Sequence, residues 1–106
     1  MTYEIRLAFD AGSGICLWAK NEAAREKYGY PINHLEIPLS ENTRRLLQHL
    51  IAWFDTSLNW EAPSDSDNCW TDEELKRFNH AVQEAYQLLS VELPPPQFVF
   101  VYEAAA

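Results

Sequence analysis

The chain has 106 residues, of which 47% are hydrophobic and 13% aromatic, and its formal net charge is −8. This aromatic content excludes a disordered chain, and the length predicts a single domain over residues 1–106. The negative charge argues against nucleic acid and anionic membranes as partners, because both select for clustered Lys and Arg.

The first residues predict a β-hairpin. Apolar and polar side chains alternate over residues 3–9, which is typical of a strand with one buried face. Residues 10–14, Asp-Ala-Gly-Ser-Gly, are typical of a turn, and residues 15–19 predict the return strand. Gly12 and Gly14 lack the Gly-Lys-Ser/Thr of a phosphate-binding loop, so we interpret them as turn glycines. We expect no signal peptide and no membrane span, because every apolar run is far shorter than about 20 residues.

The segment that follows is less regular. Residues 21–28 predict a short, weakly amphipathic helix that Asn21 caps and Gly29 ends. Two prolines interrupt residues 30–39, which predicts an extended segment across the core, with a short strand at residues 35–37 as one alternative.

Two longer helices have clear start signals. Ser40 is a good N-cap, and apolar residues at three- and four-residue spacing predict an amphipathic helix over residues 41–57. Residues 71–74, Thr-Asp-Glu-Glu, form a capping box that begins a second helix over residues 72–91. Trp70 precedes this box and is placed to pack on Leu75 as a hydrophobic staple.

Three consecutive prolines end the second helix, and residues 97–102 are β-branched and aromatic, which predicts a final strand. Both faces of this strand are apolar. We therefore expect the helices to cover one face and a further segment, with residues 20–39 as the candidate, to cover the other. The predicted fold is α+β, with an N-terminal β-hairpin, two antiparallel helices and a C-terminal strand that form a small sheet with the helices packed on it.

The negative charge is concentrated between the two helices. Residues 46–75 contain no Lys or Arg and seven acids, and three tryptophans, Trp53, Trp60 and Trp70, flank this acidic stretch. Two interpretations stay open. The tryptophans fold over the helix ends while the acids solvate a loop, or both form an interface for a cationic protein. In the second case the candidate partner-binding residues are Asp55, Trp60, Glu61, Asp65, Asp67, Trp70, Asp72 and Glu73.

The residues that could support catalysis are sparse. His34, His49 and His80 have no neighbours at metal-ligand spacing, so we interpret them as packing or surface residues. Cys16 lies in a predicted strand, and acidic neighbours oppose a thiolate at Cys69. Without a secretory signal, two free thiols in a reducing cytoplasm are favoured over a disulfide. The sequence predicts no enzyme, and a small hydrolase using these residues is the disfavoured alternative.

A calcium site in the acidic stretch is also disfavoured. Residues 65–68, Asp-Ser-Asp-Asn, begin like an EF-hand loop, but Trp70 occupies the glycine position and Lys76 the position of the bidentate glutamate. We therefore expect no metal and no cofactor.

The second two-thirds of the chain resembles a known class of proteins. The resemblance is carried by residues 39–63, which include Ala-Trp-Phe-Asp-Thr-Ser-Leu-Asn-Trp-Glu-Ala-Pro, then by Trp70, a Glu-rich helix start and a Glu-Leu pair before the last strand. These features resemble small bacterial immunity proteins encoded beside contact-dependent growth inhibition or other polymorphic toxins. The resemblance implies a cytoplasmic inhibitor, without catalytic residues, that binds and neutralises a cognate toxin domain, often a basic nuclease.

Another function stays open at this point. A regulatory or adaptor subunit that binds a different protein through its sheet edge or a helix face, without neutralising a toxin, fits the same sequence. The sequence favours a monomer but leaves the oligomeric state undetermined.

Overall fold

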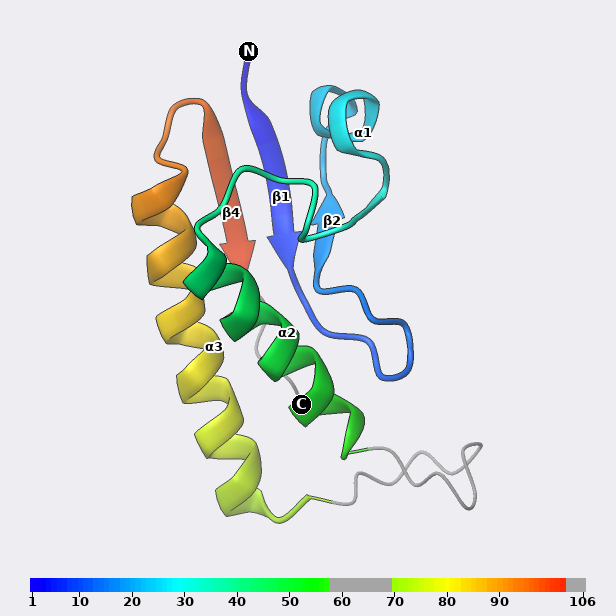
Figure 1. Cartoon of the computed structure of the whole chain (residues 1–106), viewed down its shortest axis with the longest axis vertical. Coiled ribbons are helices and arrows are strands. Elements are labelled where there is room, and N and C mark those ends of the chain that lie inside the picture. The colour runs from blue at the N-terminus through cyan, green and yellow to red at the C-terminus, as the bar shows by residue number, and fades with distance from the viewer. Residues whose placement is uncertain (58–69, 103–106) are drawn as a thin grey trace.

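A computed structural model of the chain describes residues 1–57 and 70–102. The elements in chain order are β1 (Tyr3–Leu7), β2 (Leu17–Ala19), α1 (Glu22–Tyr28), β3 (Pro31–Ile32), α2 (Glu41–Asp55), α3 (Asp72–Glu92) and β4 (Phe98–Tyr102). The predicted α+β class is confirmed, as are the N-terminal hairpin, the pair of long helices and the C-terminal strand (Figure 1).

The strands form one mixed sheet in the order β3-β2-β1-β4. β2 is antiparallel to both β1 and β3, whereas β4 runs parallel to β1. Parallel neighbours need a long crossover connection, which α2 and α3 provide here. The register places Ile5 between Ala19 and Phe100, so that a row of buried side chains crosses three strands on one face.

The hydrophobic core lies between that face and the two long helices, which lie side by side across the sheet (Figure 1). Leu47 and Leu50 of α2 are fully buried, as are Phe78 and Leu89 of α3. Each such side chain contributes about 1.5–3 kcal/mol when it leaves water. The three- and four-residue spacing in the sequence therefore identified the faces of α2 and α3 that carry the core.

The ends of the helices follow the predicted caps with small shifts. The side chain of Ser40 accepts a hydrogen bond from the amide of Thr43, and Thr71 accepts one from Glu74. α2 ends two residues before the predicted position, because the amides of Thr56 and Ser57 donate to carbonyls three residues earlier. The predicted N-cap residues of both long helices are thus confirmed.

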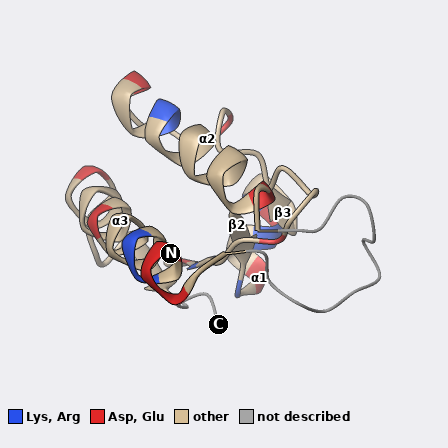
Figure 2. Cartoon of the chain, turned by 90° about the horizontal axis from the view of Figure 1, so that it is seen from below, with Lys and Arg blue, Asp and Glu red and all other residues tan. Residues whose placement is uncertain are grey.

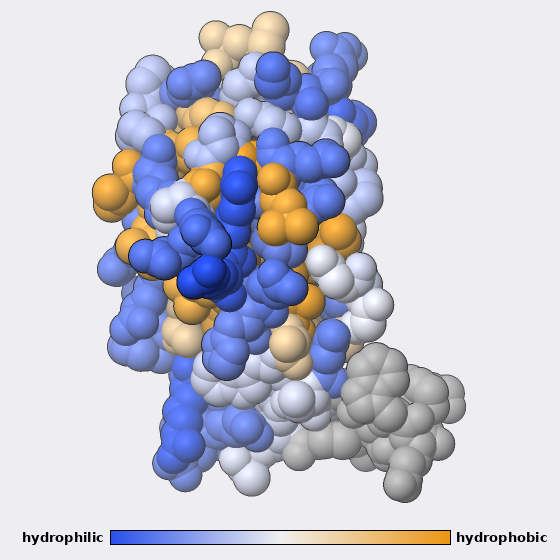
Figure 3. All heavy atoms as spheres, viewed as in Figure 1, coloured by the Kyte–Doolittle hydropathy of each residue, from blue (hydrophilic) through white to orange (hydrophobic). Residues whose placement is uncertain are grey.

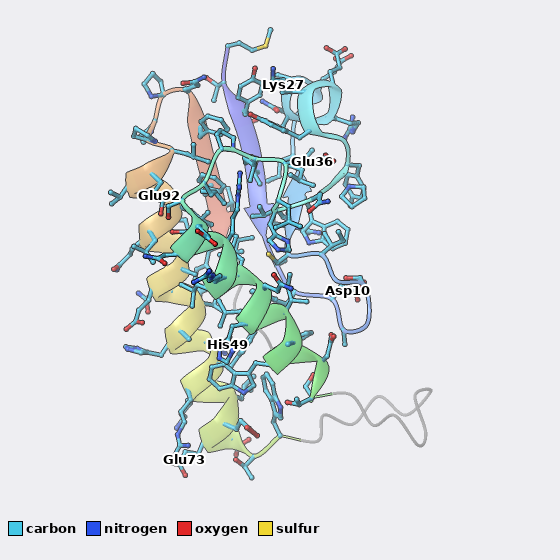
Figure 4. The ribbon with its side chains drawn as sticks, in the orientation of Figure 1. Asp10, Lys27, Glu36, His49, Glu73 and Glu92 are labelled. Atoms are coloured by element: carbon cyan, nitrogen blue, oxygen red, sulfur yellow. The ribbon has the colours of Figure 1, made fainter. Side chains whose placement is uncertain are left out.

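A carboxylate at the end of α3 also holds the start of α2. Glu92 accepts hydrogen bonds from the amide of Ser40 at 2.6 Å and from the Ser40 hydroxyl at 3.1 Å, and the Thr43 hydroxyl donates to the same carboxylate. An anion at a helix N-terminus also interacts favourably with the helix dipole. We call this arrangement of Ser40, Thr43 and Glu92 the carboxylate junction. Glu92 is labelled in Figure 4.

The alternative of a strand at residues 35–37 is wrong. Asn33 begins a turn there, in which its side-chain oxygen accepts a hydrogen bond from the Leu35 amide and its carbonyl accepts one from the Glu36 amide, both at 2.9 Å. Asn favours such turns because its side chain bonds to nearby backbone groups. The strand in this segment is instead β3, where Pro31 occupies a sheet edge, the position that tolerates proline.

The expectation that residues 20–39 cover the second face of the last strand is also wrong. Val99 and Val101 on that face of β4 are 37% and 39% exposed. The strand order explains the difference, because β1 separates β4 from β2 and β3, and β3 lies at the opposite edge of the sheet. Ile37 and Leu39, later in the same segment, are buried in the core. Tyr28 of α1 does approach Phe98, but on the buried face.

Candidate functional site

Three segments that are distant in sequence meet where α2 ends and α3 begins (Figure 1). The loop between β1 and β2 reaches this end because the Gly12 amide donates a hydrogen bond of 2.9 Å to an Asp55 side-chain oxygen. Gly12 has a φ of +82°, a conformation that favours glycine. Trp70, just before α3, packs edge-on against Phe54 of α2 with ring centroids 5.8 Å apart.

An aromatic cluster stabilises this end of the helix pair. Phe78 is fully buried at its centre, and ring centroids of four other residues surround it: Trp70 at 4.9 Å, Phe9 at 5.1 Å, Trp53 at 5.2 Å and Phe54 at 5.3 Å. Each aromatic pair adds about 0.5–1.5 kcal/mol beyond the burial of its area. The cluster fixes the relative positions of the loop, the end of α2 and the start of α3.

Carboxylates lie at the same end of the helix pair, in the last residue of α2 and the first turn of α3. We call this region the acidic end and define it by Asp55, Asp72, Glu73 and Glu74. Asp72 and Glu73 are exposed, and Glu73 forms an ion pair of 2.8 Å with Arg77 one turn later. Figure 3 views the outer face of the helix pair, on which hydrophilic and pale residues predominate toward the acidic end.

The candidate residues predicted from the sequence divide into two groups. Asp55, Trp70, Asp72 and Glu73 all lie at the acidic end, whereas Trp60, Glu61, Asp65 and Asp67 lie outside the described residues. Trp70 is half-buried on Phe78, and its indole N–H donates a hydrogen bond of 2.7 Å to the Thr56 hydroxyl. Trp70 therefore folds over the helix ends, and a direct role in partner binding stays a prediction.

A hollow beside the acidic end was not predicted. It has a volume of about 400 Å³ and is lined by His49, Ala52, Trp53 and Thr56 of α2. These residues recur at three- and four-residue spacing on a stripe next to the buried one, so helical periodicity places them together. Nothing in the sequence indicates that the surface is hollowed there.

The buried groups with shifted pKa values lie away from this hollow. Burial raises the pKa of the Cys16 thiol to about 12, so Cys16 stays protonated in the core. Burial and the charge of Arg44 both lower the pKa of His34, which is 9% exposed and so buried rather than at the surface. Cys69 lies outside the described residues. Within residues 1–57 and 70–102, no three His, Cys, Asp or Glu side chains gather as metal ligands.

Comparison with known families gives a match over nearly the whole chain. A family model described as Serratia CdiI immunity protein-like matches residues 3–104, which includes all four strands and all three helices described above. A search of curated proteins found no match. In the described part of the chain, no helix combines the length and apolar character that crossing a membrane requires.

Proposed function

The chain belongs to the Serratia CdiI immunity protein-like family, and from this premise we propose that it is a cytoplasmic, non-catalytic inhibitor that binds one cognate toxin domain through the acidic end. The toxin domain would be cationic, and a nuclease with a basic, phosphate-binding cleft fits best. The proposal is supported by the position of Asp55, Asp72, Glu73 and Glu74 at one end of the helix pair, the end that holds the aromatic cluster.

On α2 the cations lie at the end opposite to the acidic end, whereas on α3 Lys76 and Arg77 directly follow the acidic first turn, where Arg77 pairs with Glu73. Arg44 and Arg45 lie near the other end of α2, where Arg44 donates to the Ile37 carbonyl and Arg45 forms an ion pair with Glu41. Figure 2 shows the basic residues of α2 close to its start, and on α3 acidic residues over the first turn with basic residues beside them. A patch of one sign of charge steers an oppositely charged partner and raises its association rate.

The first experiment tests neutralisation itself. The toxin domain encoded by the neighbouring gene is expressed in growing cells with and without this chain, and growth is followed. We expect growth arrest without the chain and protection with it, together with a complex that survives gel filtration. A neighbouring gene that encodes no toxin-like domain, or a toxin that arrests growth equally in both cultures, would contradict the proposal.

A second experiment tests the acidic end. The double change Asp72→Asn and Glu73→Gln removes two charges without changing side-chain shape, and Glu22→Gln with Glu26→Gln on α1 is the matched control. We expect the first pair to slow association with the toxin domain by about 3–10-fold at low salt and by little at about 0.5 M salt. The control should change the rate less. Equal slowing by both pairs would mean that net charge, and not the acidic end, steers the partner.

A further inference from the structure

The hollow on α2 has a rigid aromatic wall. The indole of Trp53 is half-buried, with the ring of Phe78 edge-on at 5.2 Å and Trp70 at 6.1 Å. On its other side the His49 imidazole lies 6.1 Å from the indole. A ring that is already fixed in place loses little further freedom when a partner contacts it, which is typical of the residues that dominate protein interfaces.

Apart from the His49 imidazole, the side chains that line the hollow offer a partner an apolar surface rather than free hydrogen-bonding groups. The Thr56 hydroxyl donates to the Trp53 carbonyl and accepts from the Trp70 indole N–H, both at 2.7 Å, so its bonds are made within the protein. Ala52 contributes only a methyl group to the lining. A side chain that enters the hollow therefore contacts an indole, a methyl group and an imidazole.

The charges near the hollow favour a cationic side chain. Residues 46–75, which include all four lining residues, contain no Lys or Arg; the next cations along the chain, Lys76 and Arg77, lie on α3, where Arg77 pairs with Glu73. Asp55 adjoins Thr56, and the carboxylates of the acidic end begin two residues after Trp70. Trp is the best aromatic partner for a cation, and the alkyl stem of Lys or Arg packs well on apolar surface.

We propose that this hollow receives a lysine or arginine side chain of the cognate toxin domain, with the alkyl stem against Ala52 and the cationic group over the Trp53 indole. The inference rests on the proposed function and deepens it. It assigns the toxin a protruding basic side chain, and it makes the hollow the anchoring point beside the acidic end.

Position 52 allows a direct test, because Ala52 is exposed and its side chain lines the hollow without entering the core. The variants Ala52→Lys, Ala52→Gln and Ala52→Glu place side chains of similar length in the hollow, with charges of +1, 0 and −1. The probe is the toxin domain encoded by the neighbouring gene, in a catalytically inactive form. The control is the same charge series at Gln83, an exposed position on α3. It consists of Gln83→Lys, the wild type and Gln83→Glu.

We expect the Kd to rise in the order Glu, Gln, Lys at position 52. Ala52→Lys should raise it by about 30-fold or more, because a like charge and a filled hollow both oppose the incoming cation, whereas Ala52→Glu should change it by less than about 3-fold. The charge series at Gln83 should span less than about 3-fold. Thermal unfolding of each variant confirms that the fold is kept.

The outcomes separate this inference from the function on which it rests. If all three Ala52 variants raised the Kd equally, the side chain that enters the hollow would be apolar and not cationic, and the inference would be overturned. Wild-type binding that no Ala52 variant changes would overturn the hollow as a docking point and leave the proposed function intact. A wild-type chain that does not bind the toxin domain would overturn both.

Discussion

The two ends of the helix pair hold α2 against α3 by different means. At the carboxylate junction, Glu92 accepts hydrogen bonds from the amide and hydroxyl of Ser40 and from the hydroxyl of Thr43. At the acidic end, aromatic rings that pack around the buried Phe78 hold the two helices together. Carboxylates therefore have two different roles in this small protein. Glu92 is hydrogen-bonded to the start of α2, whereas Asp72 and Glu73 are exposed and accessible to a partner.

The largest effect is expected from a change that disrupts the aromatic cluster. Phe78→Ala removes the fully buried ring that four other aromatic rings surround, and we expect a loss of about 3–5 kcal/mol in the free energy of unfolding. Urea denaturation measures it. Gln83→Ala, exposed on the same helix, is the control and should stay within about 0.5 kcal/mol of the wild type. A loss below about 1 kcal/mol for Phe78→Ala would show that the neighbouring rings close the gap.

A smaller effect is expected from a change that disrupts the carboxylate junction. Glu92→Gln keeps the shape of the side chain but removes the charge that three hydrogen bonds share, and we expect a loss of about 1 kcal/mol in unfolding free energy. Glu84→Gln makes the same change at an exposed position of α3, where the partner is His80. It should cost less than about 0.5 kcal/mol. If both variants lost the same stability, the junction would contribute no more than a surface ion pair.

The junction should also give the molecule an acid-sensitive end. Burial alone would raise the pKa of Glu92, but hydrogen bonds from Thr43 and Ser40 outweigh it and lower the pKa from its ordinary value of 4.5. The unfolded chain therefore takes up this proton more readily than the folded one. The stabilisation is complete above about pH 4.5 and is lost as pH falls through the lower folded-state pKa.

Thermal unfolding between pH 6 and 3 measures this loss. The wild-type midpoint should fall more steeply below about pH 4.5 than that of Glu92→Gln, which lacks the titrating group. Parallel curves for the two proteins would contradict the role of Glu92.

The smallest effect concerns the loop at the acidic end. Asp55→Asn weakens the bond that holds the Gly12 amide, and because this bond is at the surface we expect a loss of only about 0.5 kcal/mol. Amide exchange measured by NMR should become faster at Gly12 and stay unchanged at Thr43, in the opposite end of the helix pair. Unchanged exchange at Gly12 would mean that the loop keeps its place without the charge.

Local signals in the sequence predicted most of the fold. Ser40 and Thr71 mark helix starts because an N-cap depends on a few adjacent residues, and the buried faces follow from helical periodicity. The turn at Asn33 was missed because apolar spacing was given more weight than the turn chemistry of one residue. The exposure of Val99 depends on strand order, which no local pattern encodes.

The candidate site was predicted in part for the same reason. Charge clustering is visible in the sequence, so the acidic residues near the ends of α2 and α3 were identified. The hollow at Trp53 depends on how its ring packs against Phe78 from another helix, which is a property of the assembled structure.

The parallel pairing of β1 with β4 joins two segments that are synthesised at different times. Residues 3–7 leave the ribosome before their partner strand, residues 98–102, so the row through Ile5 lacks one neighbour until that strand has been synthesised. At about 5–20 residues per second, this wait lasts about 5–20 s. A chain interrupted before Phe98 leaves one side of β1 without its neighbour, and such chains are natural targets for proteases. The four-stranded sheet is therefore complete only after Phe98–Tyr102 have been synthesised.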